Sequence, residues 1–183
     1  MTYIVGGTPR SGKSALRMLF LERYKIPGFC TDYLRDAIKH EVPEFGIKKG
    51  MTDMQKSEIL WPYFRGILNQ RRKYYTDDLL IEGTNFLPKY LQEFVGDENT
   101  KILFLGYTEI SVEEKFRNIR ELPSQHAEWT NDMGDQELKA SVEQFIDLSK
   151  YFKSECAKYG IRYFDTSKNF HEVISQATQT LIG

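Results

Sequence analysis

The chain has 183 residues, of which 40% are apolar, so it is long and apolar enough to fold as one domain around a packed core. Its 25 basic and 26 acidic side chains nearly cancel, which argues against a protein that binds nucleic acid through a broad basic face. No apolar run reaches the roughly 18 residues that span a bilayer, and the amino terminus lacks the pattern of a signal peptide. We therefore expect a cytoplasmic protein with no membrane segment and no nucleic-acid partner.

The chain contains two cysteines, Cys30 and Cys156, which lie far apart in the sequence. Two cysteines alone form neither a framework of disulfides nor a zinc site. Because a free cysteine packs as a small apolar side chain, we expect both to be buried thiols in a reducing compartment.

Short apolar runs alternate with amphipathic segments along the whole chain. The runs predict strands at residues 3–5, 26–32, 78–86, 101–108 and 161–167. The other segments predict helices at 13–24, 31–41, 53–75, 111–120, 135–159 and 170–181. Pro62 predicts a kink or break in the third helix, and Thr31 or Asp32 is expected to cap the second. Since the strands are continuous apolar runs, they predict an α/β fold with a parallel sheet that helices cover on both faces.

The loop after the first strand reads GTPRSGKS, residues 7–14, and fits the pattern G-x-x-x-x-G-K-[ST] between a strand and a helix. Glycines let successive backbone N–H groups point at phosphate oxygens, and the helix N-terminus adds further donors. Lys13 is expected to reach the outer phosphates of ATP, and the Ser14 hydroxyl to ligate Mg²⁺. The expected nucleotide-binding residues are Gly7, Arg10, Ser11, Gly12, Lys13, Ser14 and Ala15. The side chain of Arg10, where many such loops have glycine, either contacts nucleotide or points to solvent.

This loop in this context resembles that of the P-loop nucleoside triphosphate hydrolases and kinases. The chain has no Asn-Lys-x-Asp guanine signature, which argues against a GTPase. Its length and its single P-loop near the amino terminus resemble the small P-loop kinases. That resemblance implies a five-stranded parallel sheet with strand order 2-3-1-4-5, and a single kinase domain over residues 1–183.

A carboxylate and an arginine follow the second strand in the stretch CTDYLRDAI. Asp32 ends the strand, and Arg35 lies one helical turn further on, so both can face one cleft. Asp32 is a candidate to orient an acceptor hydroxyl and take its proton, and Arg35 a candidate to hold an anionic group of that acceptor. The alternative is that Asp32 only caps the helix.

The third strand ends in the stretch LLIEGTNFLP. Glu82 stands where a P-loop protein places its second carboxylate, and it is a candidate to hold a water on Mg²⁺ or to polarise the acceptor. We place Glu82 and the adjacent Gly83 at the acceptor site; the alternative is a carboxylate that caps a loop. Together, the TD-x-x-R and IEG segments resemble the small-molecule kinases grouped around 2-phosphoglycerate kinase, in which similar segments end the second and third strands.

Arg117 and Arg120 are three residues apart on a predicted helix and share a face. The resemblance to small P-loop kinases implies a mobile lid over about residues 117–134, whose arginines reach the transferring phosphate. The alternative is two solvated arginines beside glutamates. The resemblance also implies that the segment after the fifth strand, with Thr166, seats the adenine ring, although Thr166 or Ser167 equally fits a helix cap.

These features predict an enzyme that transfers the γ-phosphoryl group of Mg·ATP to a small-molecule acceptor. The acceptor is expected to bind against the helical region of about residues 36–75. Two alternatives stay open: a nucleoside or nucleotide kinase, and an ATP-binding module without efficient turnover. The sequence carries no signal for the oligomeric state or for the identity of the acceptor.

Overall fold

A computed structural model of the chain describes residues 1–48, 50–121 and 130–183. Within these residues, five parallel strands form one sheet in the order β2-β3-β1-β4-β5. The strands are β1 (Thr2–Gly7), β2 (Gly28–Cys30), β3 (Leu79–Gly83), β4 (Thr100–Gly106) and β5 (Arg162–Asp165). The parallel sheet and its strand order, as predicted, are confirmed.

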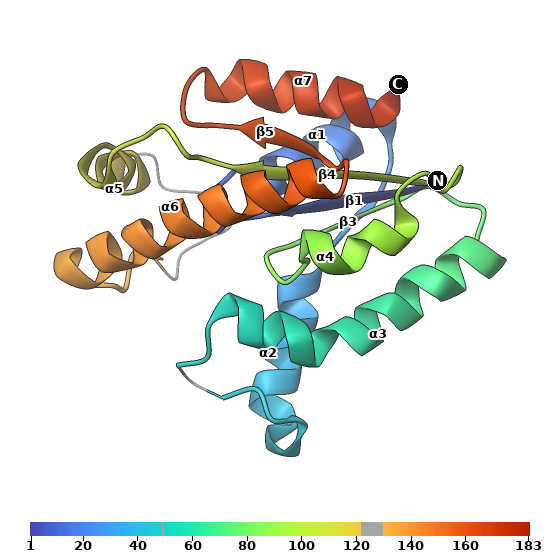
Figure 1. The fold of residues 1–183 in the computed structure, drawn as a ribbon, viewed down its shortest axis with the longest axis horizontal. Helices are drawn as coiled ribbons and strands as arrows, with labels where there is room; N and C mark the ends of the chain where they lie inside the picture. The colour runs from blue at the N-terminus through green and yellow to red at the C-terminus, as the bar shows by residue number, and fades with distance from the viewer. Residues whose placement is uncertain (49, 122–129) are drawn as a thin grey trace.

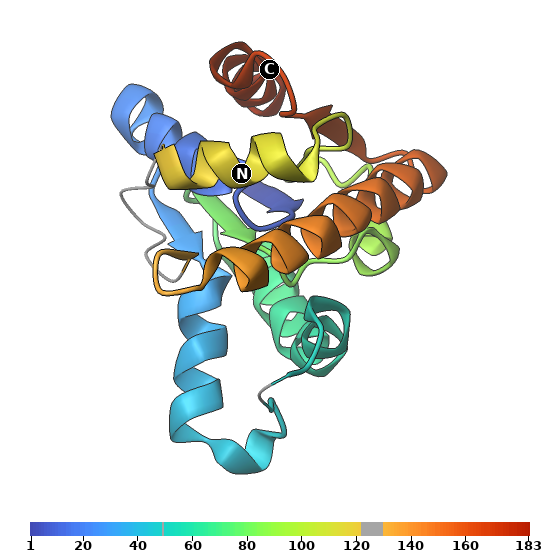
Figure 2. The same cartoon turned by 90° about the vertical axis from the view of Figure 1, so that its left-hand side faces the viewer.

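Helices cover both faces of the sheet (Figure 1). The helices are α1 (Lys13–Tyr24), α2 (Thr31–Glu41), α3 (Asp53–Tyr74), α4 (Pro88–Leu91), α5 (Val112–Glu121), α6 (Asp135–Lys158) and α7 (Phe170–Ile182), with 3₁₀ turns at Pro43–Phe45 and Gln92–Phe94. In Figures 1 and 2, α1 and α7 lie on one side of the sheet, and α3, α4 and α6 lie on the other. The amino ends of the strands lie near the chain's N-terminus, while α5 lies at the opposite, carboxyl edge (Figure 1).

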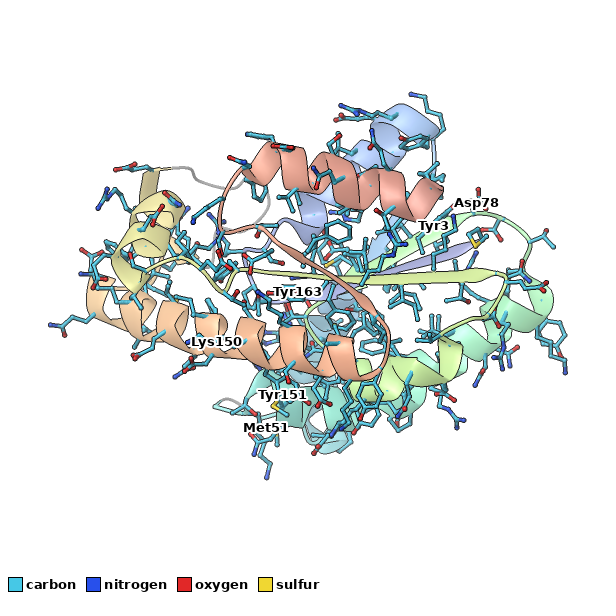
Figure 3. The ribbon with its side chains drawn as sticks, turned by 45° about the horizontal axis from the view of Figure 1, so that its top comes forward. Tyr3, Met51, Asp78, Lys150, Tyr151 and Tyr163 are labelled. Carbon is cyan, nitrogen blue, oxygen red and sulfur yellow. The ribbon has the colours of Figure 1, made fainter. Side chains whose placement is uncertain are left out.

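Successive side chains of a strand point to opposite faces of the sheet, so the strands contribute to one apolar cluster on each face. Ile4 and Phe104 face α3, α4 and α6, and Val5 and Leu105 face α1 and α7. Tyr151 of α6 and Tyr163 of β5, labelled in Figure 3, pack at the margin of the first cluster. Because both faces are buried, the strands read as continuous apolar runs.

Two cap predictions were wrong, and of the kink or break predicted at Pro62 the break is absent. Helix α3 continues through Pro62; Pro62 is exposed, so water can solvate the carbonyl that its missing N–H leaves free. Helix α2 begins at Thr31, directly after β2, and its N-cap is Cys30 without a side-chain cap bond, so neither Thr31 nor Asp32 caps it. The N-cap of α7 is Asn169, not Thr166 or Ser167.

Candidate active site

The loop between β1 and α1 has the backbone shape that its glycines predict. Gly7 has a φ of 141° and Gly12 a φ of 103°, both in the region that favours glycine. A Cβ on Gly7 would lie 2.0 Å from the carbonyl oxygen of Leu105 on β4. The loop therefore sits tightly against the end of β4 and tolerates no side chain at its first residue.

The lysine of this loop is folded back onto the loop itself. Lys13 is only 6% exposed, and its Nζ donates a 2.7 Å hydrogen bond to the carbonyl of Thr8. The Ser11 hydroxyl is fully buried and has no hydrogen-bond partner within the described residues. A buried hydroxyl without a partner costs about 1–3 kcal/mol, and a phosphate oxygen in the loop is an acceptor that would satisfy it. The donors present thus fit a bound phosphate chain.

A polar cluster joins the start of α1 to the end of β3. The Ser14 hydroxyl donates a 3.1 Å hydrogen bond to Oε1 of Glu82, which is 1% exposed. Arg17, one turn further along α1, donates from Nε to the same oxygen at 3.2 Å. The stem of Arg17 lies over β2, where a Cβ on Gly28 would be 2.3 Å from Arg17 Cγ. The predicted magnesium ligand Ser14 and the predicted carboxylate Glu82 are therefore brought together, while Arg17 was missed by the sequence reasoning.

The predicted acceptor residues meet at the next strand end. Nη1 of Arg35 donates to Asp32 Oδ1 at 2.9 Å and to Asn85 Oδ1 at 3.3 Å. Its Nε and Nη2 form a two-pronged pair with Asp36, at 2.9 Å each. Burial alone would lower the pKa of Arg35, but the hydrogen bonds that it donates to Asp36 and the negative charges of Asp32 and Asp36 raise it above its usual value. This arginine is therefore held as a cation at a partly buried site.

Asn85 connects this site to the helical region that was expected to bind the acceptor. It is fully buried, and its Nδ2 donates to the carbonyl of Asp53 at 3.3 Å and toward Ser57 Oγ at 3.5 Å. Asp53 and Ser57 lie in the first turns of α3. The amide of Asn85 thus ties the end of β3 to α2 through Arg35 and to α3 through Asp53. Its sequence position, three residues after Glu82 at a strand end, was the only signal that pointed to it.

The ends of β4 and β5 are joined by the carboxylate of Asp165. Asp165 accepts hydrogen bonds from Thr108 N at 3.1 Å and from Ser167 N at 3.0 Å. Burial raises the pKa of Asp165, but the hydrogen bonds from Ser167 and Thr108 outweigh it and lower the pKa below its usual value. Thr166 is buried, and its hydroxyl donates to the carbonyl of Gly106 at 3.1 Å. Thr166, the predicted adenine-contacting residue, therefore hydrogen-bonds to the end of β4 and not to the helix that follows it.

Helix α5 carries both predicted lid arginines. Arg117 is exposed. Arg120 donates to the carbonyls of Thr130 at 2.9 Å and Met133 at 2.6 Å, and to Asp135 at 3.0 Å. Arg120 thus links α5 to the start of α6. Residues 122–129 of the predicted lid, 117–134, lie outside the described residues.

A second lysine, missed by the sequence reasoning, lies beside the phosphate loop. Lys115 of α5 is 9% exposed, and its Nζ donates to the carbonyl of Arg10 at 2.9 Å. Burial, with repulsion from the positive charges of Arg10 and Lys13, lowers the pKa of Lys115 to about 7. Helix α5 carries several other charged side chains, so the sequence does not distinguish Lys115 from an exposed lysine.

Two absences hold for the part of the chain that the structure describes. It contains no group of three or more His, Cys, Asp or Glu side chains placed to hold a metal ion. Its helices include none with the length and apolar character to cross a bilayer. A Mg²⁺ ion at Ser14 would accordingly take most of its ligands from phosphate oxygens and water, as is usual beside a phosphate loop.

No protein-family model and no curated protein sequence matches this chain. Solved structures do match it. A shikimate kinase from Bacteroides thetaiotaomicron is 18% identical with a TM-score of 0.58, and the match covers 99% of this chain and 96% of that one. A gluconokinase from Sinorhizobium meliloti 1021 is 17% identical with a TM-score of 0.58, over 99% and 91% of the two chains. A shikimate kinase from Acinetobacter baumannii, in complex with shikimate, is 13% identical with a TM-score of 0.55, over 99% and 92%.

This chain has the P-loop kinase fold. The match covers almost the whole chain, so it includes the elements that carry the phosphate loop, the Asp32–Arg35 pair and α5. The P-loop kinase fold places all of these at the carboxyl edge of one parallel sheet. The narrower resemblance to 2-phosphoglycerate kinase rests on the TD-x-x-R and IEG segments alone.

Proposed function

We propose that this protein is an ATP-dependent kinase that transfers the γ-phosphoryl group of Mg·ATP to a small-molecule acceptor. One observation carries the proposal: the phosphate loop and a separate charged cluster meet at one edge of the sheet. Ser14 bonds to Glu82, and Glu82 pairs in register with Cys30, which is two residues before Asp32. This adjacency supports a phosphate donor site beside an acceptor site, as phosphoryl transfer requires.

On the donor side, the chain supplies positive charge and backbone N–H groups. Bound Mg·ATP would supply the phosphoryl group and the cation that neutralises its charge. Lys13 would exchange its bond to Thr8 for the outer phosphates, with the N–H groups of Gly12 and Ser14 at the start of α1 as further donors. Ser14 would provide the hydroxyl ligand for Mg²⁺, and Glu82 would orient that hydroxyl or a water on the ion. Thr166 is the residue that we propose contacts the adenine ring.

On the acceptor side, Asp32 is the residue that we propose takes the proton of the acceptor hydroxyl. Its side chain is 30% exposed, so a ligand can reach it. Arg35 is the proposed partner for an anionic group of the acceptor, which would replace the exposed carboxylate of Asp36. Asn85 accepts a hydrogen bond from Arg35 and helps to hold it in place, and the helical region of about residues 36–75 is the proposed acceptor-binding region.

The lid segment 117–134 completes the proposal. Arg117 and Arg120 close over the transferring group, neutralise its charge and exclude water, which keeps ATP hydrolysis slow. Arg120 would then exchange its bonds to Thr130 and Met133 for phosphate oxygens. An arginine in this role is worth ~10³ to 10⁵ in rate in related reactions.

The test is transfer of labelled γ-phosphate from Mg·ATP to members of an acceptor panel. The panel contains shikimate, gluconate, glycerate phosphates, other sugars, nucleosides, nucleoside monophosphates and aminoglycosides. Lys13→Ala is the inactive variant, and Lys150→Ala, an exposed residue of α6 labelled in Figure 3, is the matched control. We expect one acceptor to raise ADP formation at least tenfold and to become labelled, with Lys150→Ala as active as wild type and Lys13→Ala inactive.

The outcomes separate the open alternatives. A nucleoside or nucleoside monophosphate as the labelled acceptor would make the protein a nucleotide-type kinase. ATP binding without labelling of any acceptor in a widened panel would overturn the kinase proposal in favour of an ATP-binding module.

A further inference from the structure

Three successive carbonyls of the phosphate loop each accept a hydrogen bond from a side chain. Lys13 Nζ donates to Thr8 O at 2.7 Å, Tyr107 Oη donates to Pro9 O at 2.8 Å, and Lys115 Nζ donates to Arg10 O at 2.9 Å. The first donor belongs to the loop itself. The other two come from β4–α5, 98 and 105 residues away in the sequence.

These bonds fix the direction of the loop's N–H groups. In a trans peptide the C=O of one residue and the N–H of the next point in opposite directions, and the described chain has no cis peptide. A carbonyl of Pro9 held by Tyr107 therefore turns the N–H of Arg10 away from Tyr107. A carbonyl of Arg10 held by Lys115 turns the N–H of Ser11 away in the same manner. Two donors of the loop are thus aimed by side chains outside it.

Arg10 needs such support because its backbone is strained. Its φ is 61°, in the left-handed region that is unfavourable for a residue other than glycine. The hydrogen bond from Lys115 to the carbonyl of Arg10 holds this backbone conformation and offsets part of its strain. Arg10 stands where such loops often carry glycine, and the bond from Lys115 holds its backbone in the conformation that glycine would adopt freely.

The two outside donors are themselves rigid. Tyr107 is fully buried, and its N–H donates to Ser149 Oγ at 3.1 Å. Ser149 Oγ also lies 3.0 Å from the hydroxyl of Thr8. Lys115 Nζ lies 3.8 Å from the centre of the Tyr107 ring, so the ring stabilises the ammonium while both side chains hold the loop.

The charge at this position also favours an anion. Lys115, Arg10 and Lys13 lie close enough that the last two lower the pKa of the first. A polyphosphate in the loop would relieve this mutual repulsion.

We propose that Tyr107 and Lys115 are positioning residues that brace the phosphate loop in its ligand-binding shape before nucleotide arrives. The inference rests on the proposed function only in that the loop binds polyphosphate; it does not depend on phosphoryl transfer. It assigns a binding role to β4–α5 that is separate from the lid arginines.

Isothermal titration calorimetry of the full chain with Mg·ATP and with magnesium tripolyphosphate tests the brace. The variants are Tyr107→Phe, which removes only the O–H, Lys115→Met, which removes the donor, and Lys115→Arg, which keeps donor and charge. Tyr151→Phe and Lys150→Met, both on α6 and labelled in Figure 3, are matched controls. We expect Tyr107→Phe and Lys115→Met each to weaken both ligands by about 5–10-fold, by the same factor for each, because a net hydrogen bond is worth about 1 kcal/mol. Lys115→Arg should recover part of the loss.

A brace on the phosphate loop should weaken ATP and tripolyphosphate by the same factor while the α6 controls bind normally, whereas a defect in the adenine contacts would weaken ATP alone. Unchanged dissociation constants in both variants would overturn the brace, as would weakening of ATP with no effect on tripolyphosphate. Weakening in the α6 controls as well would also overturn it, since the effect would then be general. The two proposals can fail separately. If the variants weaken both ligands as expected but wild-type protein phosphorylates no acceptor, the kinase proposal is wrong and the role of Tyr107 and Lys115 in positioning the loop is retained.

Discussion

Ser14 and Glu82 are joined by a 3.1 Å hydrogen bond across 68 residues of sequence, from the first turn of α1 to the end of β3. Glu82 is 1% exposed, and its second donor is Arg17, whose side chain is 15% exposed. A buried carboxylate is stable only when it is paired and hydrogen-bonded, and these two donors meet that requirement. Ser14, the candidate magnesium ligand, is therefore oriented by a carboxylate that also needs its ion pair with Arg17 to be stable in the core.

Glu82→Gln is expected to lower both stability and activity. The amide keeps the shape and can accept from Ser14, but it leaves the partly buried Arg17 cation without its counter-charge, which costs about 1.5–3 kcal/mol. Chemical denaturation measures the free energy of unfolding. The double variant Glu82→Gln/Arg17→Met removes the unpaired charge and should recover most of the stability.

Activity separates the two roles of this carboxylate. If Glu82 acts on Ser14 or on Mg²⁺, the stable double variant stays impaired and needs more Mg²⁺ for half-maximal turnover. Full activity in the double variant would show that Glu82 serves only the ion pair.

Gly83→Ala is expected to destabilise the protein by about 1–3 kcal/mol, through overpacking. A Cβ on Gly83 would lie 1.7 Å from Thr31 Oγ1, a buried hydroxyl without a hydrogen-bond partner in the described residues. Thr31→Ala removes that oxygen, so the double variant should recover at least half of the loss in a denaturation experiment. Additive effects of the two changes would contradict this packing. In the stabilised double variant, an unchanged KM for the acceptor would assign Gly83 to packing rather than to the acceptor site.

Helices and strands that depend on the order of neighbouring residues could be predicted from the sequence. The apolar run before Gly6 predicted β1, and the G-x-x-x-x-G-K-[ST] pattern predicted the start of α1 at Lys13. The strand order came from the resemblance to small P-loop kinases, since no local pattern specifies which strands are neighbours. The short helix α4 was missed because it has too few residues to show a period.

The missed site residues share a different cause. Arg17, Asn85, Tyr107 and Lys115 act on partners that the fold brings to them, such as Glu82 for Arg17 and Arg10 for Lys115. Their roles depend on tertiary position and not on spacing in the sequence. Strand ends pointed to Asn85 and Tyr107 in general terms, but nothing local distinguishes Lys115 from an exposed lysine of an amphipathic helix.

Both cysteines are expected to be inert in the folded protein. Burial raises the pKa of the Cys30 and Cys156 thiols to about 12, with the negative charge of Glu82 adding to the effect at Cys30. The reactive thiolate is therefore scarce near neutral pH. A chromogenic disulfide reagent should modify both thiols at once in denaturant and neither at an appreciable rate in the native state. Rapid native modification, compared with a small free thiol, would contradict the burial of that cysteine.

Lys115 gives the protein a stability that depends on pH. Its pKa is lowered from 10.5 to about 7, first by burial and then by the charges of Arg10 and Lys13. Between these two pH values the unfolded chain binds a proton that the folded chain does not. This lysine therefore makes the protein progressively less stable as the pH falls from about 10.5 to about 7, and the loss is constant below that.

Lys115→Met should consequently stabilise the protein while it weakens nucleotide binding. Since one pKa unit is worth about 1.4 kcal/mol, the gain in unfolding free energy should be larger at about pH 7 than at about pH 9.5, by on the order of 1–3 kcal/mol. Denaturation curves at the two pH values measure it, with Lys150→Met as the control that should show no such difference. A pH-independent effect of Lys115→Met would mean that Lys115 stays charged in the folded protein. A stability gain joined to a loss of ATP affinity would show that this lysine is kept for the phosphate loop at the expense of stability.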